Sequence, residues 1–161
     1  MEDEVIRSIE KLFFKKIMLY NDLLHYLKEE RESLISIDLD KLWRISKKKE
    51  EACTDIESTK QKIIFALSLQ EDQKSFNFNR ITEAIPEKFK AKFQNLYLRI
   101  LKIKGEIEVL RIQNMTFIDD SLNFMDQIIS IISGETESRI IYNDKCRFRK
   151  LGSNLFLNRE I

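Results

Sequence analysis

The chain has 161 residues, a length that normally makes one domain. Hydrophobic residues make up 43% and charged residues 34%, with only three Gly and one Pro. This composition favours long uninterrupted helices over tightly turned sheets and Gly-rich phosphate loops. A formal net charge of +1 gives no global positive field, so nucleic acid is a poor candidate partner. We expect an all-α protein with a single domain over 1–161.

The N-terminus, the short uncharged runs and the two cysteines together predict the cellular compartment. The N-terminus reads Met1-Glu2-Asp3-Glu4 and lacks the basic and apolar regions of a secretory signal. No uncharged run exceeds eight residues, whereas a membrane-spanning helix needs about 20 apolar residues. Cys53 and Cys146 form no Cys-x-x-Cys, and we interpret both as reduced thiols. The expectation is a cytoplasmic protein with no membrane insertion.

The first two helices follow from apolar periodicity. Apolar residues recur every three or four positions from Ile6 to Leu34, except that Arg31 takes the place between Leu27 and Leu34, and this predicts a helix over about 3–35. A break follows at 33–38, where the Asp38 carboxylate is a candidate N-cap. The second helix is expected over about 39–69, with a wetter face because lysines interrupt its stripe.

A loop is expected over 70–80, because the period is lost there and Asn, Ser and Asp gather. Pro86 is then placed in the first turn of a third helix over about 86–133. This helix carries an unbroken heptad seam in which Asn114 and Ser121 are the polar members. The apolar members of the seam are Phe89, Phe93, Leu96, Ile100, Ile103, Ile107, Leu110, Phe117, Phe124, Ile128 and Ile131.

The end of the third helix is apolar over a wider face than a two-helix seam needs. Gly134 is the predicted C-cap, and a C-terminal tail follows over about 134–161. From Arg139 onward this tail has six basic residues against two acids. It could dock an acidic partner or fold back on the body. The expected architecture is an elongated antiparallel helical bundle or coiled coil of three long helices, plus a C-terminal tail or short helix.

No motif for catalysis emerges. His25 is the single histidine and has no second ligand at zinc spacing, so a surface position is expected. The paired acids are neighbours in sequence and point about 100° apart on a helix, which favours solvated faces over a shared site. We therefore expect no enzyme activity, no metal and no cofactor.

Two stretches carry a resemblance to a known family. The first runs over 23–42, with a leucine-rich helix, Glu30-Arg31, a short break and Asp38-Leu39. The second reads Asn114-x-x-Phe117-Ile118-x-x-Ser121-Leu122-x-Phe124, with Tyr142 beyond. Their order resembles the FlgN family of flagellar export chaperones. The sequence departs from the family pattern at Ile37, where family members often have Gly or another small residue, and at Cys146, where Gly is usual.

The resemblance implies a cytosolic chaperone that captures the C-terminal helices of flagellar hook–filament junction (hook-associated) proteins. It would deliver them to the flagellar type III export apparatus. In the family the binding region lies in the C-terminal part, and a client helix could lie on the wide apolar face there. The candidate client-binding residues are Asn114, Ile118, Leu122, Met125, Ile129, Ile132, Ile140, Ile141 and Tyr142.

Alternatives remain open at this point. The same candidate residues could only close the bundle against the tail. A structural coiled-coil scaffold without a client, oligomerising through the third helix, would also explain the regular seam, and a homodimer is one such arrangement. An enzyme would need a ligand set that the sequence does not offer.

Overall fold

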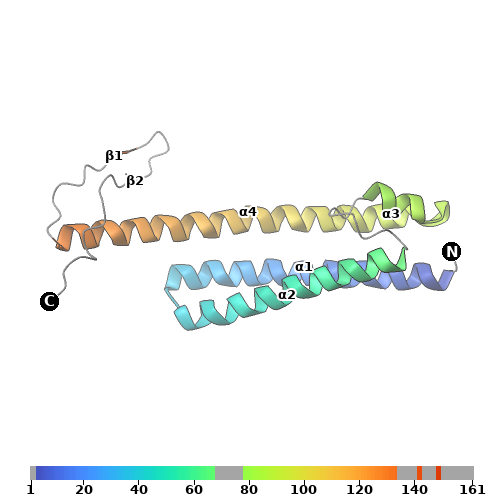
Figure 1. The fold of residues 1–161 in the computed structure, drawn as a ribbon, viewed down its shortest axis with the longest axis horizontal. Helices are drawn as coiled ribbons and strands as arrows, with labels where there is room; N and C mark the ends of the chain where they lie inside the picture. Colours follow the sequence, from blue (N-terminus) through green and yellow to red (C-terminus); the bar gives the residue numbers. More distant parts are fainter. Residues whose placement is uncertain (1–2, 68–77, 134–140, 143–147, 150–161) are drawn as a thin grey trace. The chain divides into compact units, whose positions relative to one another are not determined.

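The computed structural model describes residues 3–67, 78–133, 141–142 and 148–149. These contain the helices α1 (Asp3–Ser36), α2 (Leu39–Ala66), α3 (Phe78–Ala84) and α4 (Glu87–Ile132) (Figure 1). The strands β1 (Ile141–Tyr142) and β2 (Phe148–Arg149) are two residues long and pair antiparallel, with Ile141 opposite Arg149. The long elements are all helices, as expected of an all-α protein.

Helix α3 corrects the expected architecture. The loop predicted over 70–80 is wrong at its end, because Phe78–Ala84 is helical; residues 68–77 lie outside the described ones. Seven residues are too few to display a helical period, so the sequence pattern missed this helix. Ile81 within α3 and Ile85 directly after it are nonetheless fully buried. A bundle of three long helices is therefore an incomplete description, and its elongated shape stays a prediction.

Two further boundaries differ from expectation. Pro86 precedes α4 instead of occupying its first turn, and its carbonyl accepts the Phe89 amide hydrogen at 2.9 Å. The second helix ends at Ala66, with Leu67 as its C-cap, where a helix to about 69 was predicted. In the segment predicted as a tail or short helix, the described residues are the strands β1 and β2.

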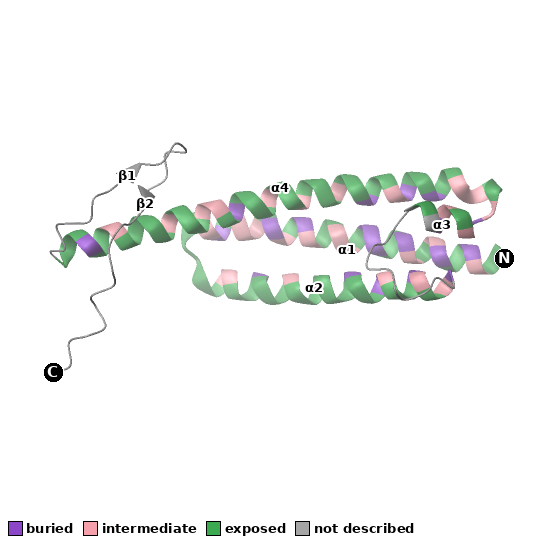
Figure 2. Cartoon of the chain, turned by 45° about the horizontal axis from the view of Figure 1, so that its top comes forward, coloured by how far each residue is buried: buried purple, intermediate pink, exposed green. Residues whose placement is uncertain are grey.

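The chain divides into two compact units, Met1–Asn114 and Met115–Ile161. In the first unit α1 and α2 lie side by side and run in opposite directions (Figure 1). The apolar stripes of its helices meet in one core, coloured purple in Figure 2. At its centre the rings of Phe13 and Phe93 pack edge to face with centroids 5.3 Å apart. The core residues are Ile6, Ile9, Phe13, Ile17, Ile63, Leu67, Ile81, Ile85, Phe93, Leu96 and Ile100.

A two-residue turn joins α1 to α2. The Asp38 amide donates to the Ser33 carbonyl at 3.0 Å and the Ile37 amide to the Leu34 carbonyl at 3.4 Å, the bond pair of a Schellman C-cap. Ile37 accordingly has a φ of 56°. The Asp38 carboxylate accepts the Lys41 amide hydrogen at 2.9 Å, so the predicted N-cap is confirmed.

The second unit contains α4 from Met115 to its end, together with β1 and β2. Ser121 Oγ donates to the Phe117 carbonyl at 2.8 Å, and the Ser133 amide donates to the Ile129 carbonyl at 2.9 Å. The second of these bonds has the i to i−4 spacing of an α-helix and closes the last turn of α4. None of the described helices is long and apolar enough to cross a membrane. The single-domain organisation predicted for the chain stays a prediction.

Candidate partner-binding face

The distinctive surface of the second unit is an apolar face on α4. Successive residues of an α-helix are turned by about 100°, so side chains at steps of three, four and seven gather on one side. Placed in this way, the large exposed apolar residues of this stretch span an arc of roughly 200°. We call this set the α4 face: Met115, Ile118, Leu122, Phe124, Met125, Ile128, Ile129, Ile131 and Ile132.

Exposure separates the α4 face from the core residues that the earlier part of the same helix contributes. In the first unit Phe93 is 0% exposed and Ile100 is 2% exposed. On the α4 face Leu122 is 56% exposed and Ile129 is 55% exposed. Contiguous exposed apolar surface of this kind typically marks an interaction site.

Five of the nine predicted site residues lie together on the α4 face. They are Ile118, Leu122, Met125, Ile129 and Ile132. Ile140 lies outside the described residues, and Ile141 and Tyr142 form β1 without described side chains. The assignment of a binding role to these residues stays a prediction.

The α4 face also contains residues that the sequence analysis did not select as binding candidates. Phe124 is 63% exposed, Ile128 40% and Ile131 76%. The sequence pattern did indicate these three residues, because all three continue the heptad seam. That seam indicated an interface for these positions, and the described residues leave them uncovered.

Asn114 is placed apart from the α4 face. Its side chain is 2% exposed, and its Nδ2 donates to the Leu27 carbonyl at 3.0 Å and to Glu30 Oε2 at 2.9 Å. Lys49 of α2 forms an ion pair with the same Glu30 carboxylate. Asn114, Glu30 and Lys49 thus form a polar network joining α4, α1 and α2, and Asn114 Oδ1 has no hydrogen-bond partner among the described atoms.

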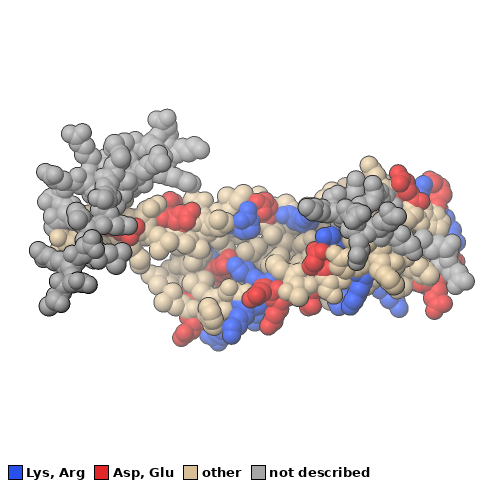
Figure 3. Space-filling view, viewed as in Figure 1, with Lys and Arg blue, Asp and Glu red and all other residues tan. Residues whose placement is uncertain are grey.

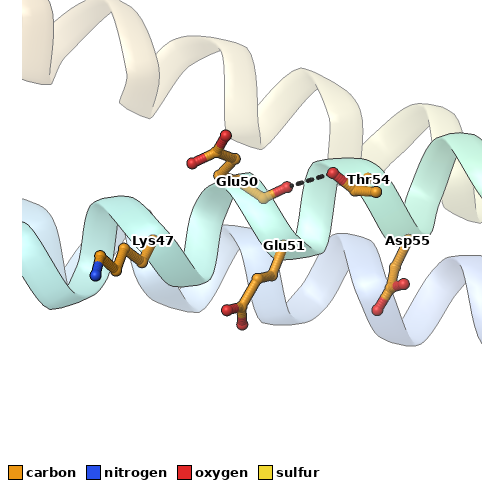
Figure 4. Close-up of a pocket in the computed structure, with 5 residues that line it drawn as sticks. All are labelled: Lys47, Glu50, Glu51, Thr54 and Asp55. Atoms are coloured by element: carbon orange, nitrogen blue, oxygen red, sulfur yellow. Dashed lines mark hydrogen bonds between the residues drawn. The ribbon is translucent and has the colours of Figure 1, made fainter.

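A surface pocket on α2 has no convergent chemistry. Its volume is about 620 Å³ and its lining consists of Lys47, Glu50, Glu51, Thr54 and Asp55. Figure 4 shows the Glu50 side chain pointing away from those of Glu51 and Asp55, while Thr54 Oγ1 donates to the Glu50 carbonyl at 3.0 Å. Glu50 therefore does not converge with the other two carboxylates, whereas a ligand site needs polar groups that converge.

The described residues contain no group of three His, Cys, Asp or Glu side chains that could hold a metal ion. The His25 side chain is 67% exposed, as expected, and its Nε2 lies 3.9 Å from Glu29 Oε2. Cys53 is an exposed free thiol. The feature of the described residues that best supports a function is the exposed apolar surface of the α4 face, which is typical of a binding surface.

One comparison with known proteins gave a match. The sequence model of a family described as "FlgN protein" matches residues 1–147. This match spans all four helices of the described residues, and with them the α4 face. No curated protein and no solved structure matches the chain.

Proposed function

Because the chain belongs to the FlgN family of flagellar export chaperones, we propose that it is a cytosolic chaperone for the hook–filament junction (hook-associated) proteins. In this proposal it binds their C-terminal helices and presents them to components of the flagellar type III export apparatus. The role is one of binding, without catalysis or cofactor.

The observation that supports the proposal most directly is the α4 face. It is long enough to accommodate several turns of a partner helix, since 18 residues of α4 (115–132) extend about 27 Å. A helix whose own apolar residues recur at three and four positions could lie along it, as in other helix-in-groove complexes. Covering one Leu, Ile, Phe or Met side chain contributes about 1.5–3 kcal/mol when burial is complete.

Met115 and Met125 add adaptability to this surface. Both are about half exposed, at 51% and 55%. The unbranched thioether side chain adjusts to differently shaped neighbours, which suits a surface that receives more than one partner.

The test is titration calorimetry of the full chain against the isolated C-terminal segments of the hook–filament junction proteins from the same organism. Binding with a negative heat-capacity change is expected, because apolar surface is buried. The double variant Leu122→Asp with Ile129→Asp should keep its helical circular dichroism and lose capture. Undiminished capture by this variant would remove the α4 face as the site.

A matched control separates this site from a general effect of added charge. Leu98 and Val109 also lie on α4 and are 53% and 57% exposed, but they belong to the first unit. The variant Leu98→Asp with Val109→Asp introduces the same two carboxylates at similar exposure. We expect it to bind client segments as the unaltered chain does.

The exposed half of the heptad seam favours one second candidate. Phe124, Ile128 and Ile131 could pair with the same residues of another copy, which would make the protein a coiled-coil scaffold or a homodimer. Light scattering at several concentrations distinguishes the two functions. A stable oligomer that recruits no client segment would favour the scaffold.

A further inference from the structure

The charges around the α4 face are of one sign. Between Ile112 and Ser133 the sequence contains Asp119, Asp120 and Asp126 and no Lys, Arg or His. All three carboxylates are exposed. On the face shown in Figure 3, this part of α4 displays red carboxylates and no blue cation.

The positions of these carboxylates follow from the helical turn of about 100° per residue. Asp119 and Asp126 are seven residues apart and share one line along the helix, next to Leu122. Asp120 falls on the opposite border, one turn before Phe124. The remaining polar positions between the two borders are neutral. Carboxylates therefore border the apolar arc on both sides.

No described cation neutralises them. The basic residue immediately upstream is Arg111, which belongs to the first unit and whose Nη2 lies 2.7 Å from Glu108 Oε1. The three aspartates have no ion pair within the described residues. Among the described residues, the negative charge along the apolar arc is therefore not balanced by a cation.

We propose that the α4 face selects amphipathic helices whose apolar stripe is flanked on both sides by Lys or Arg. This rests on the proposed function and names the chemistry of the partner. Apolar burial supplies the affinity, whereas the bordering carboxylates discriminate between partners and orient them. A helix flanked by acids is rejected, because like charges would face each other along both borders.

Three synthetic peptides test the proposal. Each is an amphipathic helix of about 18 residues, matched to the length of the face, with one identical leucine stripe. The positions flanking the stripe are all Lys, all Gln or all Glu. Their affinities for the full chain are measured by fluorescence anisotropy at low and at physiological ionic strength, with peptide helicity checked by circular dichroism.

The expected order of affinity is Lys, then Gln, then Glu. Exposed ion pairs contribute little singly, so three together should separate the Lys and Glu peptides by about tenfold, or about 1.4 kcal/mol. The separation should shrink as salt is added, because exposed charges are screened. In the variant Asp119→Asn, Asp120→Asn, Asp126→Asn it should fall to about twofold or less.

A control variant carries the same change in net charge elsewhere. Asp22, Glu51 and Asp55 are exposed residues of the first unit. The variant Asp22→Asn, Glu51→Gln, Asp55→Asn should keep the order of affinity. A loss of selectivity in this control would mean that net charge acts at long range, and would overturn the assignment to the three bordering aspartates.

The outcomes distinguish this proposal from the function on which it rests. Equal binding of all three peptides overturns charge selection and leaves the docking face intact. Binding of none, the Gln peptide included, overturns both. A Lys preference that persists in the Asp119, Asp120 and Asp126 variant places the selecting charges elsewhere and also overturns the proposal.

Two other occupants of the face would be recognised in the same experiments. A stable homodimer that Leu122→Asp with Ile129→Asp dissociates would assign the face to a second copy. Peptide binding that appears only after the basic residues of the tail are replaced by Gln would assign it to the chain's own tail. Either result would overturn the proposal that a basic-flanked helix of another protein occupies the α4 face. The tail residues to replace are Arg139, Lys145, Arg147, Arg149, Lys150 and Arg159.

Discussion

At the scale of single residues, Ile37 is held in a conformation that its side chain disfavours. Its φ of 56° is left-handed, where a β-branched residue is strained by about 1–2 kcal/mol. The side chain is 71% exposed and gains little burial in return. We expect Ile37→Gly to raise the free energy of unfolding by about 0.5–1 kcal/mol, after the greater chain entropy of Gly in the unfolded state is subtracted. Urea unfolding monitored by circular dichroism measures the change.

Ile35 provides the matched control for this prediction. It is 63% exposed, two residues away, and lies within α1, where Gly has no conformational advantage. Ile35→Gly should lower stability by about 1 kcal/mol. If Ile37→Gly is also less stable than the unaltered chain, the strain argument is wrong.

Lys16 is a second residue in an unfavourable environment, because its charged side chain is buried. It is 2% exposed, and burial, followed by the charges of Lys104 and Lys60, lowers its pKa from 10.5 to about 8, with Glu57 acting in the opposite direction. Below pH 8 the folded and unfolded states both carry the proton, and the burial penalty is complete. Between about 8 and 10.5 the unfolded state binds more protons, so this residue makes stability rise with pH there.

Lys16→Met should remove this contribution to the pH dependence of stability. We expect the variant to be more stable than the unaltered chain by about 2–3 kcal/mol at pH 7. The difference should shrink as the pH approaches 10.5, the ordinary value for lysine. Chemical unfolding across this pH range measures both, and the exposed neighbour Lys15 supplies the control Lys15→Met. A constant difference at every pH would contradict the role assigned to protonation.

At the scale of elements, the polar network of Asn114, Glu30 and Lys49 connects three helices at one level of the first unit. Glu30→Ala removes the carboxylate that both other members use. Leaving partly buried polar groups without their partner costs about 1–3 kcal/mol. The exposed Glu32→Ala on the same helix should change stability by less than about 0.5 kcal/mol. Equal effects of the two substitutions in thermal unfolding would show that the network contributes nothing specific.

The same elements show what the amino-acid sequence could and could not predict. The long helices could be predicted because apolar residues repeat over many turns. The N-cap role of Asp38 could be predicted because capping is a local interaction. The pairing of Asn114 with Glu30 could not be predicted, because helical periodicity carries no information on which residues of two helices lie at the same level. Asn114 was consequently assigned to the binding surface, whereas the structure places it in the interior.

For the candidate site, periodicity was enough to find a wide apolar face but not to tell whether anything covers it. The exposed fractions of Leu122 and Ile129 were needed for that. Phe124 and Ile131 were read as part of a continuous seam, yet only its first half is buried in the core of the first unit. Whether a seam is filled depends on how far the neighbouring helices extend, which a pattern within one helix does not reveal.

At the scale of the whole molecule, the two units should differ in local stability. Residues 93–103 of α4 contribute to the core of the first unit, whereas 115–132 have few buried side chains. A helical stretch that lacks tertiary packing opens at low free-energy cost, since most helical stability in proteins comes from packing of the apolar face. Hydrogen exchange should therefore be faster over 115–132 than over 93–103. Adding the Lys-flanked peptide should slow exchange over 115–132, because its helix packs on the α4 face, and should leave 93–103 nearly unchanged. Equal protection of both stretches in the free protein would mean that the α4 face is already covered, and the client would then have to displace what covers it.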